Sequence, residues 1–562
     1  MLQTNPDFPI TTPVRPRRVL WSSGFSSASL FASLIVLLPI AAIVWLAVSD
    51  GADSGDWGHL MRNVVPRASW ETLLLIAYTA LATGVFGILT AWLVASFQFP
   101  LRRTLATALV LPLAIPGYMA AYAFGELFSF TGSLQTLVRS LFGFQSSRDY
   151  WFPDIRSLPG AVLVLSAVLY PYVYLACRST FLMQGRASAD VARTLGAGPL
   201  RVFLTVQLPM ARPAIMVGLT LVAMETMNDI GAVEYLGVKT LTFSIFDTWL
   251  NRGSLAGAAQ IACIMLLFVI ALMSIERAAW RKQRFSNQKT TSAIRDGARI
   301  PLDRWKGLGA MVICLIPVLL GFLVPVFVLG DFALRRLDQF ADPRLAVALF
   351  NSIKVASACA AVTVFLGFLI AYSARNGHSR LSLLSGRLAS FGYGVPGTVL
   401  AIGVLFPLAA FDNGLDGVLR STFGFSSGLL LSGSAFAIIY ACSVRFLTMA
   451  EGTVEAGFQK LSPHLDMASR TLGRTRLQTL YAVLLPMMRP ASLTAALLVF
   501  IESMKELSAT IMLRPFNFNT LATLVYEDAS RGMIENTSVA ALIIIAAGLI
   551  PVALVSRTLD RA

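Results

Sequence analysis

Long apolar runs separated by short polar stretches dominate the sequence. The first run extends from Phe25 to Val48. Eleven more of similar length follow at 71–97, 104–130, 158–177, 209–231, 255–275, 308–329, 350–374, 388–411, 428–449, 486–513 and 539–555. An α-helix of about 20 apolar residues crosses the hydrocarbon core of a bilayer and satisfies its own backbone hydrogen bonds there. The pattern therefore predicts an all-α polytopic membrane protein with about twelve transmembrane helices.

Composition and charge agree with this pattern. Of the 562 residues, 56% are hydrophobic and only 13% are charged, and the mean hydropathy is +0.70. A soluble core does not absorb so much apolar surface. The net charge of +15 is spread between the apolar runs, which is typical of topology signals and not of a nucleic-acid surface. The five cysteines are scattered within the runs and indicate packing residues, neither a disulfide framework nor a metal site.

Basic residues also predict the orientation of the chain. The stretch 277–306 carries nine Lys or Arg side chains. Because Lys and Arg accumulate on the cytoplasmic side of membrane proteins, we expect this linker in the cytoplasm. With six runs on each side of the linker, both termini then lie in the cytoplasm too. The sequence thus predicts four parts: a cytoplasmic arm at 1–24, a first half at 25–276, the linker at 277–306 and a second half at 307–562.

One polar motif occurs in each predicted half. Residues 190–196 read DVARTLG and residues 467–473 read MASRTLG, and a Leu-Pro pair follows each copy. Gly196 and Gly473 are 277 positions apart, as are Pro209 and Pro486. An Ile/Val-Pro-Gly triplet at 115–117 also recurs, 280 positions later. These repeats indicate a duplication. Because each half has an even number of helices, the halves share one orientation and are related by an axis along the membrane normal.

The repeated motif resembles the EAA loop of type I ABC importer permeases, a cytoplasmic helix-glycine-helix element that docks on the ATP-hydrolysing subunit. Residues 190–192 and 467–469 stand where that family has Glu-Ala-Ala. The second copy departs from the pattern, because Met467 has no carboxylate and the closest acid is Asp466. A single chain with two such loops is most similar to the ferric-iron importers of bacteria. The resemblance implies docking residues in two loops, 188–213 and 464–490: Asp190, Ala192, Arg193, Leu195, Gly196, Pro209, Ala468, Arg470, Leu472, Gly473 and Pro486.

The residues of the two loops fit a docking role. An acid such as Asp190 favours the first turn of a short helix, and a glycine such as Gly196 can end the helix in a left-handed conformation. The two leucines offer apolar contacts, and the two arginines offer charged ones. A loop that only connects two helices is the alternative interpretation. Two copies with the same spacing from glycine to proline argue against it.

The sequence contains no motif for nucleotide chemistry. It has no phosphate-binding loop of the GxxxxGK(S/T) type, and its three histidines are far apart. We therefore expect neither a catalytic residue nor a cofactor on this chain. The resemblance implies that ATP and Mg2+ bind to two copies of a separate cytoplasmic ATPase. It also implies a periplasmic binding protein that delivers the cargo, and a place in the lipid bilayer of the bacterial inner membrane.

Acidic side chains inside the apolar runs predict the transport pathway, because charges in a membrane segment are costly and point to function. Glu225 and Asp229 are four positions apart, Glu502 and Glu506 repeat this spacing, and Glu126 lies in the third run. Carboxylates from two halves offer oxygen ligands to a hard cation such as Fe3+. An interhelical lock is the alternative, in which Lys505 or Asn228 satisfies Glu502 or Glu506. Tyrosines of the third and fourth runs offer further oxygens, although packing is their commoner role: Tyr118, Tyr122, Tyr170, Tyr172 and Tyr174.

The sequence leaves the cargo open. Ferric iron follows from the resemblance, but importers of thiamine, phosphonate and polyamines share the duplicated loop. A proton-coupled secondary transporter with two parallel halves is a different class, in which Glu225 and Glu502 would carry protons. That class needs no ATPase and leaves the duplicated loops without a role. The prediction is therefore an ATP-driven permease that moves ferric iron by alternating access.

Overall fold

The structure is a computed structural model of the chain, and it describes residues 23–49, 56–183, 192, 194–281, 299–376, 386, 391–462 and 464–561. Within these residues, ten helices are long and apolar enough to cross a membrane, or twelve if each of two bent helix pairs counts as one span. The predicted all-α polytopic fold with about twelve spans is confirmed. The sheet in the described part is one short parallel pair, β1 (Phe97–Gln98) with β2 (Ile300–Pro301).

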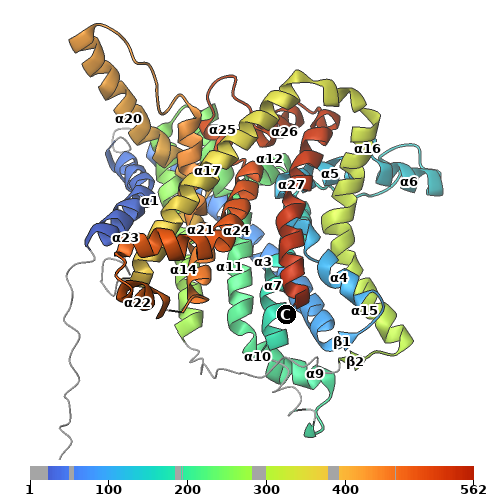
Figure 1. The fold of residues 1–562 in the computed structure, drawn as a ribbon. Helices are drawn as coiled ribbons and strands as arrows, with labels where there is room; N and C mark the ends of the chain where they lie inside the picture. Colours follow the sequence, from blue (N-terminus) through green and yellow to red (C-terminus); the bar gives the residue numbers. More distant parts are fainter. Residues whose placement is uncertain are drawn as a thin grey trace, which may run out of the picture.

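The elements follow the predicted runs with additional short helices between them (Figure 1). The first half contains α1 (Ser23–Ser49), α2 (Asp56–His59), η1 (Leu60–Val64), α3 (Val65–Ser96), α4 (Arg102–Ala108), η2 (Leu111–Ala114), α5 (Gly117–Phe128), α6 (Ser133–Phe142), α7 (Leu158–Met183), α9 (Pro199–Val202), η3 (Phe203–Gln207), α10 (Leu208–Met210), α11 (Arg212–Asn228), α12 (Ile230–Tyr235), α13 (Leu241–Phe246), η4 (Asp247–Asn251) and α14 (Leu255–Arg281).

The second half extends from α15 onwards. It contains α15 (Arg304–Val318), η5 (Leu319–Leu323), α16 (Val324–Arg335), η6 (Leu337–Ala341), α17 (Pro343–Asn376), α19 (Phe391–Gly394), α20 (Gly397–Phe423), α21 (Ala435–Gln459), α22 (His464–Thr471), α23 (Arg476–Thr479), η7 (Leu480–Leu484), α24 (Leu485–Lys505), α25 (Thr510–Leu513), α26 (Leu521–Ser530) and α27 (Ile534–Arg561). In Figure 1, α9, α10 and α22 lie in the lower part of the view, and α26 and the turn between α16 and α17 lie in the upper part.

Two of the predicted spans are interrupted at the repeated Pro-Gly pair. The chain bends by 96° between the segments 102–114 and 117–142, inside the run 104–130. Pro116 has no N–H to donate, and Ile115 before it is extended, so the helix ends and α5 begins anew at Gly117. The run 388–411 breaks in the same way at Pro396, and α20 begins at Gly397. The predicted runs 104–130 and 388–411 are therefore each divided between helices, because the repeated Pro-Gly pair starts a new helix inside each run.

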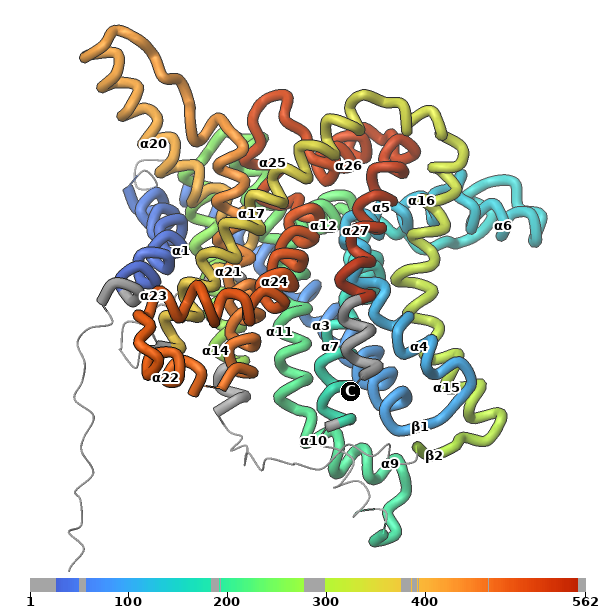
Figure 2. Tube along the Cα trace, in the orientation of Figure 1, coloured from blue at the N-terminus to red at the C-terminus, as the bar shows by residue number. Residues whose placement is uncertain are grey.

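The two halves interlock. Helix α1 of the first half packs against α17 and α20 of the second half, and α15 and α16 of the second half pack against α3, α4 and α5 of the first (Figure 2). The hydrophobic core accordingly consists of two clusters, and each contains residues from both halves. A movement of either half therefore carries a helix of the other half with it. The predicted part boundaries at 24, 276 and 306 stay predictions.

The duplication extends to single hydrogen bonds. Leu241 N donates to Thr72 Oγ1 at 2.9 Å, and 280 positions later Leu521 N donates to Ser352 Oγ at 2.7 Å. In both halves a hydroxyl of a long helix, α3 or α17, thus holds the start of a shorter helix, α13 or α26. The two halves share a backbone plan and not only a motif.

Candidate transport pathway and docking loops

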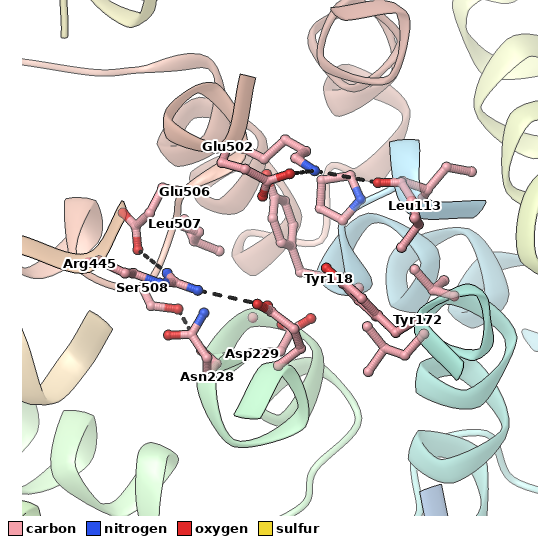
Figure 3. Close-up of a pocket in the computed structure, with 18 of the residues that line it drawn as sticks. Leu113, Tyr118, Tyr172, Asn228, Asp229, Arg445, Glu502, Glu506, Leu507 and Ser508 are labelled. Carbon is pink, nitrogen blue, oxygen red and sulfur yellow. Dashed lines mark hydrogen bonds and ion pairs between the residues drawn. The ribbon is translucent and has the colours of Figure 1, made fainter. Parts of the chain in front are cut away.

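A group of charged side chains surrounds a cavity of about 100 Å³ where the two halves meet (Figure 3). The first half contributes the start of α5 and the end of α11, and the second half contributes α21 and the end of α24. A cavity of this size has room for a few water molecules. The polar residues that line it are Tyr118, Tyr172, Glu225, Asn228, Asp229, Arg445, Glu502, Lys505, Glu506 and Ser508.

The structure brings four of the five predicted pathway acids together. Glu225, Asp229, Glu502 and Glu506 all line the cavity. Glu126 does not, because it lies near the far end of α5, close to where that helix ends at Phe128. The transport role of all five acids stays a prediction.

Two of these carboxylates have the same structural task in the two halves. Asp229 Oδ1 accepts a hydrogen bond from Ala232 N at 2.9 Å, and Glu506 Oε1 accepts one from Ala509 N at 2.8 Å. Each acid thus ends a membrane helix and caps the short helix that follows. The Pro-Gly pairs make room for them. A Cβ on Gly117 would lie 1.9 Å from Asp229 Oδ2.

The cations at the cavity both come from the second half. Arg445 of α21 lies 3.3 Å from Glu506 and 3.8 Å from Glu225, so it bridges the halves. Lys505 pairs with Glu502 at 2.7 Å. The sequence analysis did not single out Arg445, although a charge within the apolar run 428–449 was a signal that could have found it.

Asn228 adds two hydrogen bonds across the seam between the halves. Its side-chain oxygen accepts from Gly397 N at 2.8 Å, and its carbonyl accepts from Ser508 Oγ at 2.6 Å. Together with Arg445, these bonds hold α11 of the first half against α20, α21 and the segment that follows α24.

The geometry agrees with part of the predicted interhelical lock. Lys505 neutralises Glu502 as that alternative proposed, but Glu506 pairs with Arg445, and Asn228 bonds to Gly397 and Ser508 instead of a glutamate. Among the residues that the structure describes, no three His, Cys, Asp or Glu side chains are grouped closely enough to hold a metal ion.

The two docking loops share one turn. Ala197 N donates to Ala192 O at 3.1 Å, and 277 positions later Arg474 N donates to Ser469 O at 3.2 Å. The glycines inside these turns are left-handed, with φ of +84° at Gly196 and +82° at Gly473. This is the helix ending that glycine favours. Asp190 and Arg193 lie outside the described residues.

The loops expose apolar side chains in matching positions. Leu195 is 83% exposed and Leu472 is 82% exposed, in otherwise polar turns. Leu200 and Leu477, also 277 positions apart, are exposed as well, and so are Ala468 and Arg470. The two turns thus present apolar side chains to the surface at equivalent positions.

The second loop is fixed to the membrane helices by the acid beside its motif. Arg375 at the end of α17 pairs with Asp466 at 2.9 Å and also donates to the carbonyls of Phe458 and Leu461. Ser469 Oγ and Thr479 Oγ1, 2.9 Å apart, brace the turn from inside. Asp466 therefore points inwards and does not replace the carboxylate that Met467 lacks.

The two prolines do not start the membrane helices as predicted. Helix α23 continues through η7 into α24 as one candidate span, 476–505, so Pro486 lies within it. In the first half the chain bends by 68° between 199–210 and 212–228, after Pro209. Both halves have a second proline four positions later. The prolines alone therefore do not explain why the chain bends here in the first half and continues as one span in the second.

Comparisons with known proteins match both halves. Residues 84–285 and 363–562 each match the family model described as binding-protein-dependent transport system inner membrane component. The Fe(3+)-transport system permease protein FbpB 2 of Haemophilus influenzae is 23% identical over 502 residues, which are 87% of this chain and 89% of that protein.

Other relatives match one half at a time. The sulfate transport system permease protein CysT of Salmonella typhimurium is 29% identical over 225 residues, 40% of this chain and 78% of that protein. The molybdate/tungstate transport system permease protein WtpB of Methanocaldococcus jannaschii is 26% identical over 246 residues, 43% of this chain and 90% of that protein.

The two family matches decide between the classes that the sequence left open. They cover most of the chain, and they agree with the predicted ABC importer permease and not with a secondary transporter. Members of the family are multi-pass permease components of the inner membrane and are not enzymes themselves. The chain belongs to the family of binding-protein-dependent transport system inner membrane components.

Proposed function

We propose that this chain is the two-half permease of an ATP-driven importer that receives ferric iron from a periplasmic binding protein. The observation that carries the importer proposal is the duplicated helix-glycine-helix turn, with an exposed leucine in each copy. Two equivalent turns offer docking points to two copies of a cytoplasmic ATPase, which would bind ATP and Mg2+. The loops, the basic linker and both termini then lie on the cytoplasmic side.

The proposed mechanism is alternating access. When the two ATPase copies close on ATP, they pull the loops together, and α23 transmits this movement into α24 because η7 joins them without a break. The end of α24 carries Glu502, Lys505 and Glu506. A shift there separates Arg445 from Glu225 and frees Asn228, which opens the seam outwards. ATP hydrolysis then resets the closed arrangement.

Ferric iron is supported by the relative that spans both halves, the Fe(3+) permease. Four carboxylates at the seam would offer a passing Fe3+ the oxygen ligands that a hard cation prefers. A sulfate-like oxyanion is a second candidate. Arg445 and Lys505 line the same cavity, and the sulfate and molybdate/tungstate permeases match single halves.

The test is uptake into vesicles that hold this chain and its cognate ATPase, with the binding protein outside. Radiolabelled ferric iron and sulfate are compared, with and without internal ATP. We expect ATP-dependent accumulation of iron. Accumulation of sulfate alone would replace the cargo and keep the importer, and uptake without ATP would contradict the importer itself.

A paired substitution tests the docking turns. Leu195→Asp with Leu472→Asp places charges on two exposed apolar contacts, so we expect at least a tenfold loss of ATPase recruitment. Leu141→Asp is the matched control, because Leu141 is 70% exposed on α6, in the upper part of Figure 1. Equal ATPase recruitment by the double variant and the control would contradict the docking assignment.

A further inference from the structure

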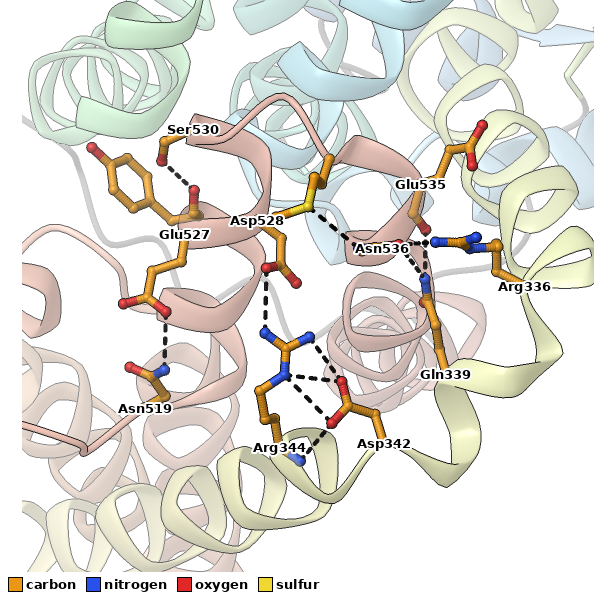
Figure 4. Close-up of polar contacts among 12 residues, drawn as sticks. Arg336, Gln339, Asp342, Arg344, Asn519, Glu527, Asp528, Ser530, Glu535 and Asn536 are labelled. Carbon is orange, nitrogen blue, oxygen red and sulfur yellow. Dashed lines mark hydrogen bonds and ion pairs between the residues drawn. The ribbon is translucent and has the colours of Figure 1, made fainter.

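A second cavity, of about 320 Å³, lies at the opposite end of the molecule from α9 and α10, where η6 and the start of α17 meet α26 and α27 (Figure 4). Its polar lining consists of Arg336, Asp338, Gln339, Asp342, Arg344, Asp528 and Asn536. In the proposed orientation, this cavity opens to the side from which the cargo arrives.

Several of its side chains are held by their neighbours. Arg344 pairs with Asp342 at 2.9 Å, which holds the pKa of the Asp342 carboxyl below its usual range. Arg336 Nη2 donates to Asn536 Oδ1 at 2.7 Å, and Gln339 Nε2 donates to the same oxygen at 3.2 Å. The wall of the cavity is therefore built before any ligand arrives.

Three buried polar atoms around this cavity have no hydrogen-bond partner. They are Asp528 Oδ1, Gln339 Oε1 and Arg336 Nε. Asp528 is only 2% exposed, and its ion partner Arg344 is 3.8 Å away, beyond hydrogen-bond distance. Burial raises the pKa of the Asp528 carboxyl. Because a buried carboxylate without hydrogen bonds is costly, this one needs a reason to persist.

The shared fold does not require these charges. In the first half, the positions 280 residues earlier hold Thr248 in place of Asp528, Val64 in place of Arg344, and Arg62 in place of Asp342. The same backbone plan thus forms without the carboxylate and its cation. The residues that line the polar cavity all belong to the second half.

We propose that this cavity receives a basic side chain, Arg or Lys, of the soluble binding protein that delivers the cargo. A guanidinium or ammonium group supplies the donor that Asp528 Oδ1 lacks, and a charge-assisted bond to a buried carboxylate is strong and directional. Because the first half has Thr248 and Val64 at the positions equivalent to Asp528 and Arg344, the cavity selects one of two orientations of the docked protein. This inference rests on the proposed import function.

The experiment measures the affinity of the cognate binding protein for the permease-ATPase complex in nanodiscs. We expect Asp528→Asn to weaken binding at least tenfold, because one charge-assisted bond is lost. Asp331→Asn is the matched control, since it removes the same charge from α16, where Asp331 pairs with Arg335 outside the cavity. Basal ATPase activity reports whether each variant assembles.

Charge reversal makes the test specific. We expect Asp528→Lys to abolish docking, and one Arg→Glu or Lys→Glu substitution in the binding protein to restore it. Equal affinity of wild type and Asp528→Asn would overturn the inference and leave the importer intact, whereas no docking on the wild type would contradict the proposed function. The complex is also titrated with Mg2+ or Fe3+ alone. If the ion bound to the wild type and not to Asp528→Asn, the ligand of the cavity would be a free ion, and the proposed side chain of the binding protein would be wrong.

Discussion

At the candidate pathway the two halves share one backbone feature, a carboxylate that accepts a hydrogen bond from the N–H three residues later, but different charged side chains surround it. Glu225 of the first half corresponds to Glu502 of the second at a spacing of 277, and Asp229 corresponds to Glu506. Between them the first half has Asn228 and the second has Lys505. Facing them, Val168 of α7 occupies the position of Arg445 in α21.

This comparison separates the capping acids, which both halves contain, from the cations at the cavity, which the second half contributes. Both halves keep an acid that caps the helix after the break, because the chain needs that bond to change direction. Only the second half supplies cations, so Glu225 of the first half uses Arg445 of the second. Four carboxylates share two cations at the seam. The charge balance of the cavity therefore depends on the second half.

The largest expected effect is that of Arg445→Gln. It leaves Glu506, which is 5% exposed, without its cation and removes the ion pair across the seam. Breaking a buried pair typically costs about 3–5 kcal/mol, so we expect a clear loss of thermal stability and of coupled uptake. Thermal unfolding in nanodiscs and vesicle uptake measure these effects.

A surface arginine is the matched control for Arg445. Arg420 pairs with Asp416 at 2.7 Å on an exposed part of α20, where such pairs contribute at most about 1 kcal/mol. We expect Arg420→Gln to leave stability and uptake almost unchanged. If Arg445→Gln behaved like Arg420→Gln, the seam would not depend on this cation.

A smaller effect is expected from proline in the docking turns. Gly196 and Gly473 have φ above +80°, whereas proline fixes φ near −65°. Gly473→Pro and Gly196→Pro therefore destroy the turns but leave the membrane helices in place. We expect normal membrane insertion with strongly reduced stimulation of the ATPase, measured with purified components.

The control for the glycines is on the other side of the molecule. Gly143 ends α6 with φ of +72°, so Gly143→Pro imposes the same backbone conflict away from the loops. We expect it to leave ATPase stimulation unchanged. Equal loss in all three variants would point to a general folding defect and contradict the docking role.

The sequence predicted the spans and the repeat because both are periodic. Apolar length decides which segments cross a bilayer, and a spacing of 277 is visible without coordinates. It did not predict the breaks at Pro116 and Pro396, because an apolar run looks the same with or without a bend. It also paired Glu506 with the wrong partners, because contacts between halves depend on packing that no local pattern encodes.

The smallest expected effect, and the most informative, is that of Lys505→Asn. This change gives the second half the residue type that the first half has at the equivalent position, Asn228. The side chain of Glu502 is 31% exposed, so the loss of its partner costs little stability, roughly 1 kcal/mol or less. The change makes the cavity more negative by one charge. A cation such as Fe3+ loses nothing by this, because the carboxylate ligands remain and one repulsive charge is gone.

We therefore expect iron uptake by Lys505→Asn to stay within about twofold of the wild type, since screening by solvent limits the effect of one partly exposed charge. An oxyanion would lose one of its two cations at the seam, so sulfate uptake would fall several-fold. Initial rates for both radiolabelled cargoes, measured in the same vesicles, separate the two cases. A fall in iron uptake alone would show that Lys505 has a task that Asn228 of the first half does not share, and the electrical asymmetry of the seam would then be part of the transport step itself.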